Sequence, residues 1–212
     1  GKSTFVQQMV ANYVRGNLSV GYYQGDRSQE EVKSNFLTIG LSEEELAKVN
    51  FYSCLQEITP EQMVKISSLY DVFVFDSFLT YTNKLNQDYN LAAWLAESFS
   101  SVVKEKKNHI LTVAHQQTHD GLAHQEKIAS SKQIKQKADM ILAVERYDEY
   151  FAHKVKNELG RESEFYNDLL LYSRTGNPSS FVSIFKNQTS GELIRIPLLF
   201  EKEKKLFKNY QN

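Results

Sequence analysis

The chain has 212 residues, with 25 Lys and Arg against 26 Asp and Glu, so its formal net charge at pH 7 is −1. This balance does not indicate a generally basic nucleic-acid-binding protein, and any basic surface must be local. The single cysteine, Cys54, excludes a disulfide framework and a cysteine-rich zinc site, and fits a reducing compartment. No apolar run approaches the ~20 residues of a membrane-spanning helix, and no signal-peptide pattern opens the sequence. An intracellular globular protein is expected.

A phosphate-binding sequence opens the chain, which begins Gly1, Lys2, Ser3, Thr4. These residues match the end of the motif G-x-x-x-x-G-K-[ST], and apolar residues at helical spacing follow over 5–14. A helix that begins here directs free backbone N–H groups and its positive dipole end toward an anion. Lys2 would reach the outer phosphates, and the Ser3 hydroxyl would bind Mg²⁺. The alternative, for these residues alone, is an ordinary helix start capped by Ser3.

Strands and helices then alternate along the chain, which is typical of a parallel α/β sheet. Helices are predicted after Ser28, which can form a capping box with Glu31, and after Thr59, with Pro60 in the first helical position. Strands are predicted over 19–23, 50–53, 71–76, 109–115 and 140–144. The last three are apolar enough to be buried on both faces.

The last third of the chain has a different pattern. Short strands are predicted over 168–172, 181–185 and 192–196, and the turn residues between them favour an antiparallel hairpin region at a sheet edge. The charged tail over 201–208 is expected to fray. No internal repeat and no low-complexity linker divides the sequence, so residues 1–212 are predicted to form one domain.

Polar residues end two of the predicted strands. Asp76 ends a buried strand, where phosphate-loop enzymes carry an aspartate that contacts Mg²⁺, although it can also cap the next segment. His115 ends the following strand, where a side chain bonded to the γ-phosphate would sense its hydrolysis, or where it merely closes the strand. The sequence spacing of the histidines matches no tight metal-ligand pattern, so metal binding is not expected at His109, His115, His119 or His124.

The segment over 131–146, SKQIKQKADMILAVER, resembles the helicase half of phage primase–helicases and mitochondrial Twinkle, and more distantly DnaB-type replicative hexameric helicases. The shared pattern is a serine-containing loop, a glutamine before an Ala-Asp pair, an apolar strand and a Glu-Arg pair. Residues 1–6, Asp76 and His115 match the family's first helix, its Mg²⁺ aspartate and its γ-phosphate-sensing histidine. Residues 171–176 and 185–191 resemble its arginine-finger strand and the hairpin that follows. The matches occur in family order and cover nearly the whole chain.

The resemblance implies an α/β fold, namely a RecA-like P-loop NTPase core with a mostly parallel central sheet and a C-terminal antiparallel hairpin region. It implies an ATP-dependent DNA helicase domain that uses Mg²⁺ and couples hydrolysis of ATP, or another nucleoside triphosphate, at subunit interfaces to translocation. The implied partners are single-stranded DNA, further copies in a hexameric ring, and primase or other replisome proteins, with no membrane. The implied location is the cytoplasm of a bacterial or phage-infected cell, or the mitochondrial matrix for a Twinkle-like protein.

The resemblance also assigns roles to single residues. Catalytic positions are matched by Lys2, Asp26, Asp76, His115 and Arg174, and nucleotide positions by Gly1, Lys2, Ser3, Thr4, Arg146 and Phe185. Ser3 and Asp76 would bind the metal ion. Arg146 and Phe185 would sandwich the base, with core packing as the alternative for Phe185. Arg174 matches the finger that reaches into a neighbour's site, with a solvated surface position as the alternative.

Contact with DNA would fall to residues that face the channel of a ring. These are Lys84, Lys127, Lys132 and Gln136. The polar stretches over 80–90 and 116–131 are expected to be loops at the functional edge of the sheet, where a ring would repeat a modest positive charge in every subunit. Plain solvated loops are the alternative. Gln136 matches a glutamine that couples nucleotide state to the DNA-binding loop.

The sequence departs from the family at several positions. Asp26 stands where the family has a catalytic glutamate that orients the attacking water, and its side chain is one methylene shorter. Tyr172 stands where the DnaB branch often has lysine. The first strand and the front of the phosphate loop are not seen before Gly1, so the chain is expected to be a fragment. The alternatives are a RecA- or KaiC-like ATPase in recombination or signalling, and a hydrolysis-deficient nucleotide-binding partner for assembly or loading, which Asp26 favours.

Overall fold

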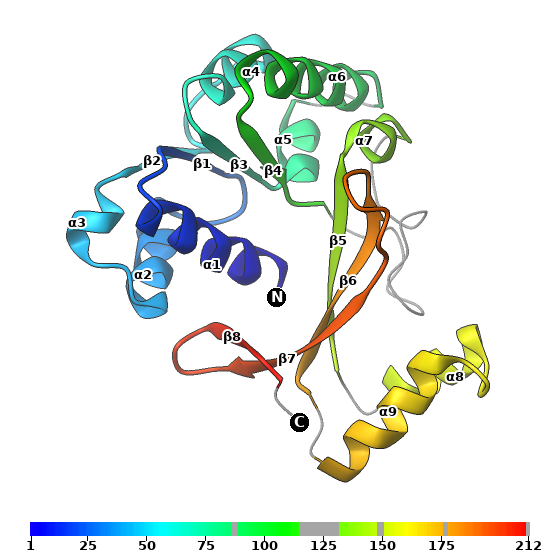
Figure 1. Cartoon of the computed structure of the whole chain (residues 1–212). Helices are drawn as coiled ribbons and strands as arrows, with labels where there is room; N and C mark the ends of the chain where they lie inside the picture. The colour runs from blue at the N-terminus through cyan, green and yellow to red at the C-terminus, as the bar shows by residue number, and fades with distance from the viewer. Residues whose placement is uncertain (86–88, 115–131, 148–150, 176–177, 211–212) are drawn as a thin grey trace.

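Two four-stranded sheets organise the molecule (Figure 1). The computed structural model describes residues 1–85, 89–114, 132–147, 151–175 and 178–210. One sheet has the order β2-β1-β3-β4 with parallel neighbours, and the other has the order β5-β6-β7-β8 with antiparallel neighbours. None of the helices in these ranges is long and apolar enough to cross a membrane.

The parallel sheet consists of β1 (Val20–Gln24), β2 (Val49–Ser53), β3 (Val72–Asp76) and β4 (His109–Thr112). These four strands were all predicted from the sequence, although β4 ends three residues before the predicted limit at position 115. The two central strands, β1 and β3, are buried along their whole length. Because β1 and β3 run parallel, their carboxyl ends meet at one edge of the sheet, where Gln24 pairs with Asp76.

Helices cover both faces of the parallel sheet (Figure 1). One face carries α1 (Lys2–Arg15) and α2 (Gln29–Ile39), and the other carries α4 (Pro60–Ser67), α5 (Phe78–Lys84) and α6 (Tyr89–Lys106). The short α3 (Glu43–Leu46) lies between α2 and β2. Because side chains alternate along a strand, Val72 and Val74 of β3 face α1 and α2, whereas Phe73 and Phe75 face the other helices.

Local capping explains where two predicted helices begin. The Ser28 hydroxyl accepts a hydrogen bond from the Glu31 N–H, which starts α2, although the Glu31 carboxylate pairs with Arg27 instead of completing a capping box. Thr59 and Gln62 form a complete capping box at the start of α4, with Pro60 in the first position. Both predicted helix starts are confirmed, because short-range hydrogen bonds determine them, but the capping box predicted at Ser28 is not formed.

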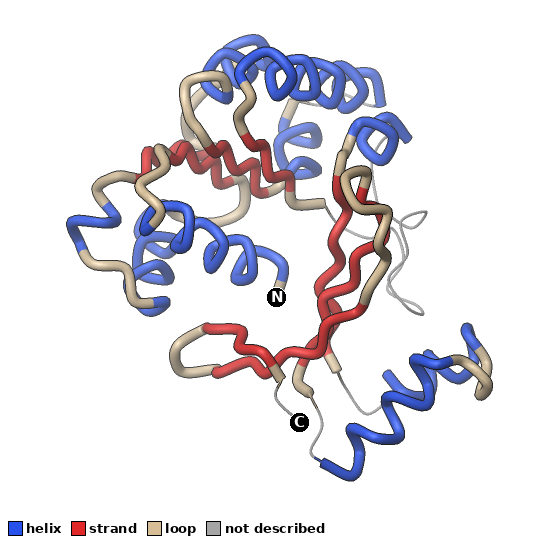
Figure 2. The backbone as a smooth tube through the Cα atoms, viewed as in Figure 1, coloured by secondary structure: helices blue, strands red, loops and turns tan. Residues whose placement is uncertain are grey.

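The antiparallel sheet consists of β5 (Met140–Arg146), β6 (Ser180–Asn187), β7 (Arg195–Glu201) and β8 (Leu206–Asn209). Figure 2 shows it running from α7 (Lys132–Lys137) at one end to the β7–β8 hairpin beside α1 at the other. The predicted hairpin region is thus confirmed. The prediction that β5 is buried on both faces is wrong, because Met140 and Leu142 are 49% and 36% exposed.

Three elements of the last third differ from the prediction. The strand predicted over 192–196 lies further along the chain, as β7 from Arg195 to Glu201. Residues 168–172 are not a strand but lie in α9 (Glu164–Thr175), which packs with α8 (Phe151–Leu159). Only Leu169 of the leucine run enters the core, beside Phe181, so the run marks one face of a helix. The tail over 201–208 does not fray either. It completes the β7–β8 hairpin, whose Phe207 backbone exchanges hydrogen bonds of 2.8 and 2.7 Å with the Gln8 side chain.

Candidate functional site

The N-terminal end of α1 lies at the carboxyl edge of the parallel sheet, beside β5 (Figure 1). A Cβ atom on Gly1 would stand 3.6 Å from the Cγ1 of Val144 in β5, and Phe5 packs edge-on against Phe207 of β8. The phosphate-binding sequence thus reaches the edge where β1 and β3 end. This placement follows from the apolar face of α1, which buries Val10 and Val14 against the sheet.

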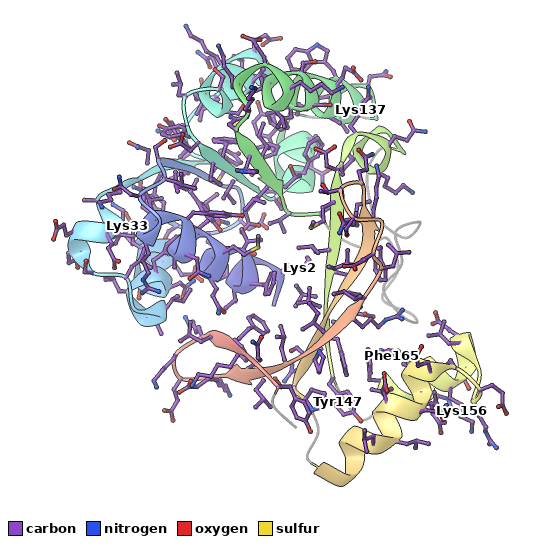
Figure 3. All side chains as sticks on the ribbon, in the orientation of Figure 1. Lys2, Lys33, Lys137, Tyr147, Lys156 and Phe165 are labelled. Atoms are coloured by element: carbon purple, nitrogen blue, oxygen red, sulfur yellow. The ribbon has the colours of Figure 1, made fainter. Side chains whose placement is uncertain are left out.

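The first turn of α1 suits an anion. Gly1 is its N-cap and makes no side-chain capping bond, and the first turn contains no acidic residue. The backbone N–H groups of this turn therefore lack the intrahelical partners that later turns provide, and the helix dipole adds positive potential. Figure 3 shows Lys2 at this end of α1, where its side chain is exposed.

Several cations act on the same region. Lys2, Arg27 and Arg146 place positive charge near the Gly1 end of α1, and Asp76 places negative charge there. These three basic side chains come from α1, the segment after β1, and the end of β5. The sequence analysis did not single out Arg27, which forms an ion pair of 3.1 Å with Glu31.

Asp76 is the carboxylate at the centre of this edge. Its side chain is only 1% exposed, and burial raises its pKa, whereas hydrogen bonds from Ser3 and Tyr22 lower it. The nearby charge of Asp26 raises the pKa of Asp76 as well, and that of Arg27 lowers it. The structure therefore brings Ser3 and Asp76 together, as the motif requires, and also brings Asp26 within electrostatic range of Asp76.

Asp26 lies in the segment between β1 and α2, next to the start of α5. The Thr80 hydroxyl donates a hydrogen bond to its Oδ1, and the Thr80 and Ser77 hydroxyl oxygens are 2.8 Å apart. Gln24 anchors the turn when its amide is oriented so that its oxygen accepts from the backbone N–H groups of Asp26 and Arg27, at 3.0 and 3.1 Å. The position of the Asp26 carboxylate is thus fixed by the side chain of a residue that comes after β3.

The residues at this edge fit a magnesium ion that is brought in by a phosphate ligand. A serine hydroxyl and an aspartate carboxylate are hard oxygen donors of the kind Mg²⁺ prefers. Among the described residues, no cluster of three or more His, Cys, Asp or Glu forms a self-sufficient metal site. Mg²⁺ commonly takes one or two protein ligands and completes its octahedron with phosphate oxygens and water, which is the arrangement this donor pair can support.

Two predicted site residues are not brought together. Arg146 pairs with Ser180 at one end of the β5–β6 ladder, whereas Phe185 lies at the irregularity opposite Ile141 and Leu142 near the other end. The five residue steps from position 180 to 185 separate them by about 16 Å along the strand. A sandwich of one base between Arg146 and Phe185 of the same chain is therefore not formed in this structure.

The remaining predicted positions are accounted for as follows. His115 and Lys127 lie outside the described residues, and so do the side chains of Lys84, Lys132 and Arg174. The backbone of Lys84 lies in α5 and that of Arg174 in α9, so the predicted loop and strand settings are wrong for these two residues. Gln136 is exposed on α7, and its backbone oxygen accepts a hydrogen bond of 3.0 Å from Lys186.

The site contains residues that the sequence analysis missed, above all Tyr22 and Thr80. A tyrosine within a fully buried strand was the available signal for Tyr22, because a buried hydroxyl normally needs a hydrogen-bond partner. Thr80 gave no comparable signal, since its partner Asp26 is 54 residues away in the sequence.

A helix start with a lysine and a serine, close to an aspartate at the end of a central parallel strand, is the arrangement found in phosphate-loop folds. Solved structures with the same fold include the ATPase domain of the protein G40P, with a TM-score of 0.68 and 15% identity over all of this chain and 81% of that one. A DnaB-like replicative helicase, studied in its interactions with primase, gives 0.68 and 14% identity over all of this chain and 55% of its own.

A KaiC-like protein from the hyperthermophilic archaeon Pyrococcus horikoshii also has this fold, with a TM-score of 0.66 and 10% identity over all of this chain and 84% of its own. No protein-family profile and no curated protein sequence matches the chain. At these identities the similarity establishes the fold: α/β, RecA-like, with a parallel sheet and a C-terminal antiparallel region.

Proposed function

We propose that this chain is an ATPase domain that binds a nucleoside triphosphate with Mg²⁺ at the carboxyl edge of the parallel sheet and hydrolyses it. The observation that carries the proposal is the meeting of Ser3, on the uncapped first turn of α1, with the buried carboxylate of Asp76. The α1 N–H groups and Lys2 would hold the phosphates, and Ser3 and Asp76 would hold the metal ion. The metal would neutralise charge on the phosphate oxygens.

Asp26 is proposed to orient the attacking water. Its carboxylate follows β1 on the same edge as Asp76, and the proton-accepting group in such sites must reach a water beside the terminal phosphate. The Thr80 hydroxyl holds the carboxylate by one oxygen, which leaves the other oxygen for water. Because the Asp26 carboxylate is held in position, it favours a hydrolysing enzyme over the alternative of a hydrolysis-deficient nucleotide-binding partner.

The experiment that tests the nucleotide site compares Lys2→Ala with Lys33→Ala in the intact protein. Lys33 lies on α2 above the Phe51 ring, far from Lys2 (Figure 3), and serves as a matched loss of one lysine. We expect Lys2→Ala to lose hydrolysis and to weaken nucleotide binding, whereas Lys33→Ala keeps both. Unchanged turnover in Lys2→Ala would contradict the phosphate-site assignment.

We further propose that the domain belongs to a ring-forming DNA helicase that couples hydrolysis to translocation on single-stranded DNA. The resemblance of residues 131–146 and the structural similarity to a DnaB-like replicative helicase support this proposal. Primase is named as a partner of one neighbour, and it is a proposed partner here. The cellular location and the formation of one domain by residues 1–212 stay predictions.

A KaiC-like or recombination ATPase is the second candidate, because the KaiC-like protein has a nearly equal TM-score and the fold is shared. The two candidates differ in their response to DNA. A helicase domain in its assembled form should hydrolyse nucleotide faster when single-stranded DNA is added, and should move along it. Turnover that is indifferent to single-stranded DNA, in a protein shown to be assembled, would favour the second candidate.

A further inference from the structure

The hydroxyl of Tyr22 lies against the metal-binding carboxylate proposed above. It donates a hydrogen bond of 3.0 Å to the Oδ2 of Asp76, and both side chains are almost completely buried, with exposures of 0% and 1%. Neither the phosphate-binding motif nor the family resemblance assigns a role to position 22. A buried hydrogen bond from a neutral donor to a carboxylate is among the stronger side-chain contacts, because it is assisted by charge and shielded from water.

Aromatic packing and the strand register orient the Tyr22 side chain toward the carboxyl edge of the parallel sheet. The ring packs edge-on against Phe36 at 5.7 Å and tilted against Phe51 at 6.1 Å. In the β1–β3 register Tyr22 stands opposite Val74, two residues before Asp76, so its side chain reaches along the sheet toward the carboxyl edge beneath α1. The packing of the Tyr22 ring therefore determines the geometry of its hydrogen bond to Asp76.

Two other polar side chains lie close to this contact. Ser3 also donates a hydrogen bond to Asp76, and the side chain of Gln7 of α1, at 1% exposure, lies beside the Tyr22 hydroxyl. Loss of the hydroxyl would leave Oδ2 of a buried carboxylate without this partner.

We propose that Tyr22 is a positioning residue for Mg²⁺, holding Oδ2 of Asp76 so that Oδ1 is presented to the metal ion beside Ser3. This inference rests on the proposed nucleotide site. It predicts an effect on the metal that is separate from the binding of the nucleotide itself, because the Tyr22 hydroxyl bonds to the carboxylate of Asp76, which is not assigned to the phosphates. Partners of metal ligands typically change metal affinity by ~10–100-fold when removed.

The test replaces Tyr22 with phenylalanine, which keeps the ring and removes the hydroxyl. Binding of a fluorescent ATP analogue is measured in EDTA and then in a Mg²⁺ titration, so that the readout does not depend on hydrolysis. We expect Tyr22→Phe to bind the analogue in EDTA as the wild type does, and to need roughly tenfold more Mg²⁺ for half of the Mg²⁺-dependent change.

Tyr23→Phe is the matched control. Tyr23 is the adjacent residue of β1 and is equally buried, but it faces the other side of the sheet, where its ring packs against Phe75 and Tyr81. We expect its Mg²⁺ requirement to equal that of the wild type. A second comparison uses Asp76→Asn, in which adding Tyr22→Phe should cause no further loss of Mg²⁺ response, because the two residues act through one contact.

The outcomes distinguish a failure of the positioning role of Tyr22 from a failure of the proposed nucleotide site. If the wild type binds nucleotide with Mg²⁺ and Tyr22→Phe has the same Mg²⁺ requirement as Tyr23→Phe, the positioning role is wrong and the nucleotide site stands. If Tyr22→Phe weakens binding equally in EDTA and in Mg²⁺, its role is structural and the proposal is overturned. If the wild type binds no nucleotide under any condition, the proposed function fails and the inference with it.

Discussion

The Thr80 hydroxyl donates a hydrogen bond to the Oδ1 of Asp26, joining the first helical turn after β3 to the segment after β1. A glycine allows this approach, because a Cβ atom on Gly25 would lie 3.1 Å from the Cβ of Thr80. The backbone N–H of Gly25 also donates to the Asp76 carbonyl oxygen at 2.6 Å. The carboxylate proposed to orient water is thus positioned by the element that follows β3, the strand that ends at Asp76.

Replacing Thr80 with valine should lower the rate of hydrolysis without weakening nucleotide binding. Valine keeps the shape of threonine but donates no hydrogen bond, so Asp26 would lose its fixed orientation. A hydrogen bond to a charged group is worth about 1.5–3 kcal/mol, which corresponds to roughly 10–100-fold in kcat. Steady-state kinetics check this, with Thr80→Ser expected to restore the rate. Thr82→Val, on the same helix, is the control, since the Thr82 hydroxyl bonds to the Phe78 carbonyl oxygen and should not affect kcat.

Asp26→Asn should retain the affinity for ATP while kcat falls. Asparagine has nearly the same shape, but its amide cannot accept a proton, and loss of a general base typically costs ~10²–10⁴-fold. Asp26→Glu restores the longer carboxylate of the helicase family and should remain active. The measurements are kcat and a separate equilibrium binding constant. Equal kcat in the wild type and Asp26→Asn would place the base elsewhere, with Glu30 and Glu31 as the next residues to examine.

Arg174 provides the test of a site shared between subunits. If its guanidinium completes a neighbour's site, Arg174→Ala should bind nucleotide normally and hydrolyse it roughly 10³–10⁵-fold more slowly. Mixing Arg174→Ala subunits with Lys2→Ala subunits should restore part of the activity, because some interfaces then combine an intact phosphate site with an intact finger. No recovery, in assemblies shown to have exchanged subunits, argues against the finger. Normal hydrolysis by Arg174→Ala alone would show that Arg174 is not an arginine finger.

Asp71 should make the stability of the fold sensitive to acid without affecting the site. It lies before β3, at the opposite end of the sheet, and the Ser19 hydroxyl and backbone N–H donate to it at 2.7 and 2.8 Å. These hydrogen bonds lower the pKa of Asp71 below its usual value. A lowered pKa means that the stabilisation is present at neutral pH and is lost as pH falls below about 4, through the pKa of the folded state.

The measurement is the unfolding midpoint of the wild type and of Asp71→Asn as a function of pH. At neutral pH the variant should unfold at a lower temperature, and the gap between the two proteins should narrow below about pH 4. Nucleotide affinity should be the same in both proteins at neutral pH. A gap that stays constant with pH would show that the carboxylate charge is not what stabilises this end of the sheet.

Elements determined by local interactions could be predicted from the sequence. The caps at Ser28 and Thr59 and the apolar run of β3 act within a few residues, and the structure confirms them. The leucines over 169–171 were misassigned because consecutive apolar residues suit either a buried strand or one turn of a helix. Packing of Leu169 against Phe181 decides between the two, and that contact is not visible in a local pattern.

The candidate site was predictable only in part, for a similar reason. Ser3 and Asp76 belong to motifs whose partners are set by the topology of parallel sheets, and they do meet. Tyr22 donates a hydrogen bond to Asp76, and Thr80 donates one to Asp26, in each case from another element of the fold. These contacts depend on how far the side chains reach, which a local sequence pattern does not show. The separation of Arg146 from Phe185 depends on the register of β5 on β6, which the sequence does not specify.

The paired hydrogen bonds between Gln8 and Phe207 connect residues 199 positions apart. In a chain made from its N-terminus, the Gln8 amide is therefore synthesised long before the backbone groups that it will bond. Until the β7–β8 hairpin arrives, α1 can dock against the parallel sheet, α2 and β5, but Phe5 lacks its edge-on contact with Phe207. Contacts of such long range form late and slow folding. The helix that opens the phosphate site thus acquires its final support among the last events of folding, so shortening the chain before residue 207 should leave a folded parallel sheet with a loosened α1.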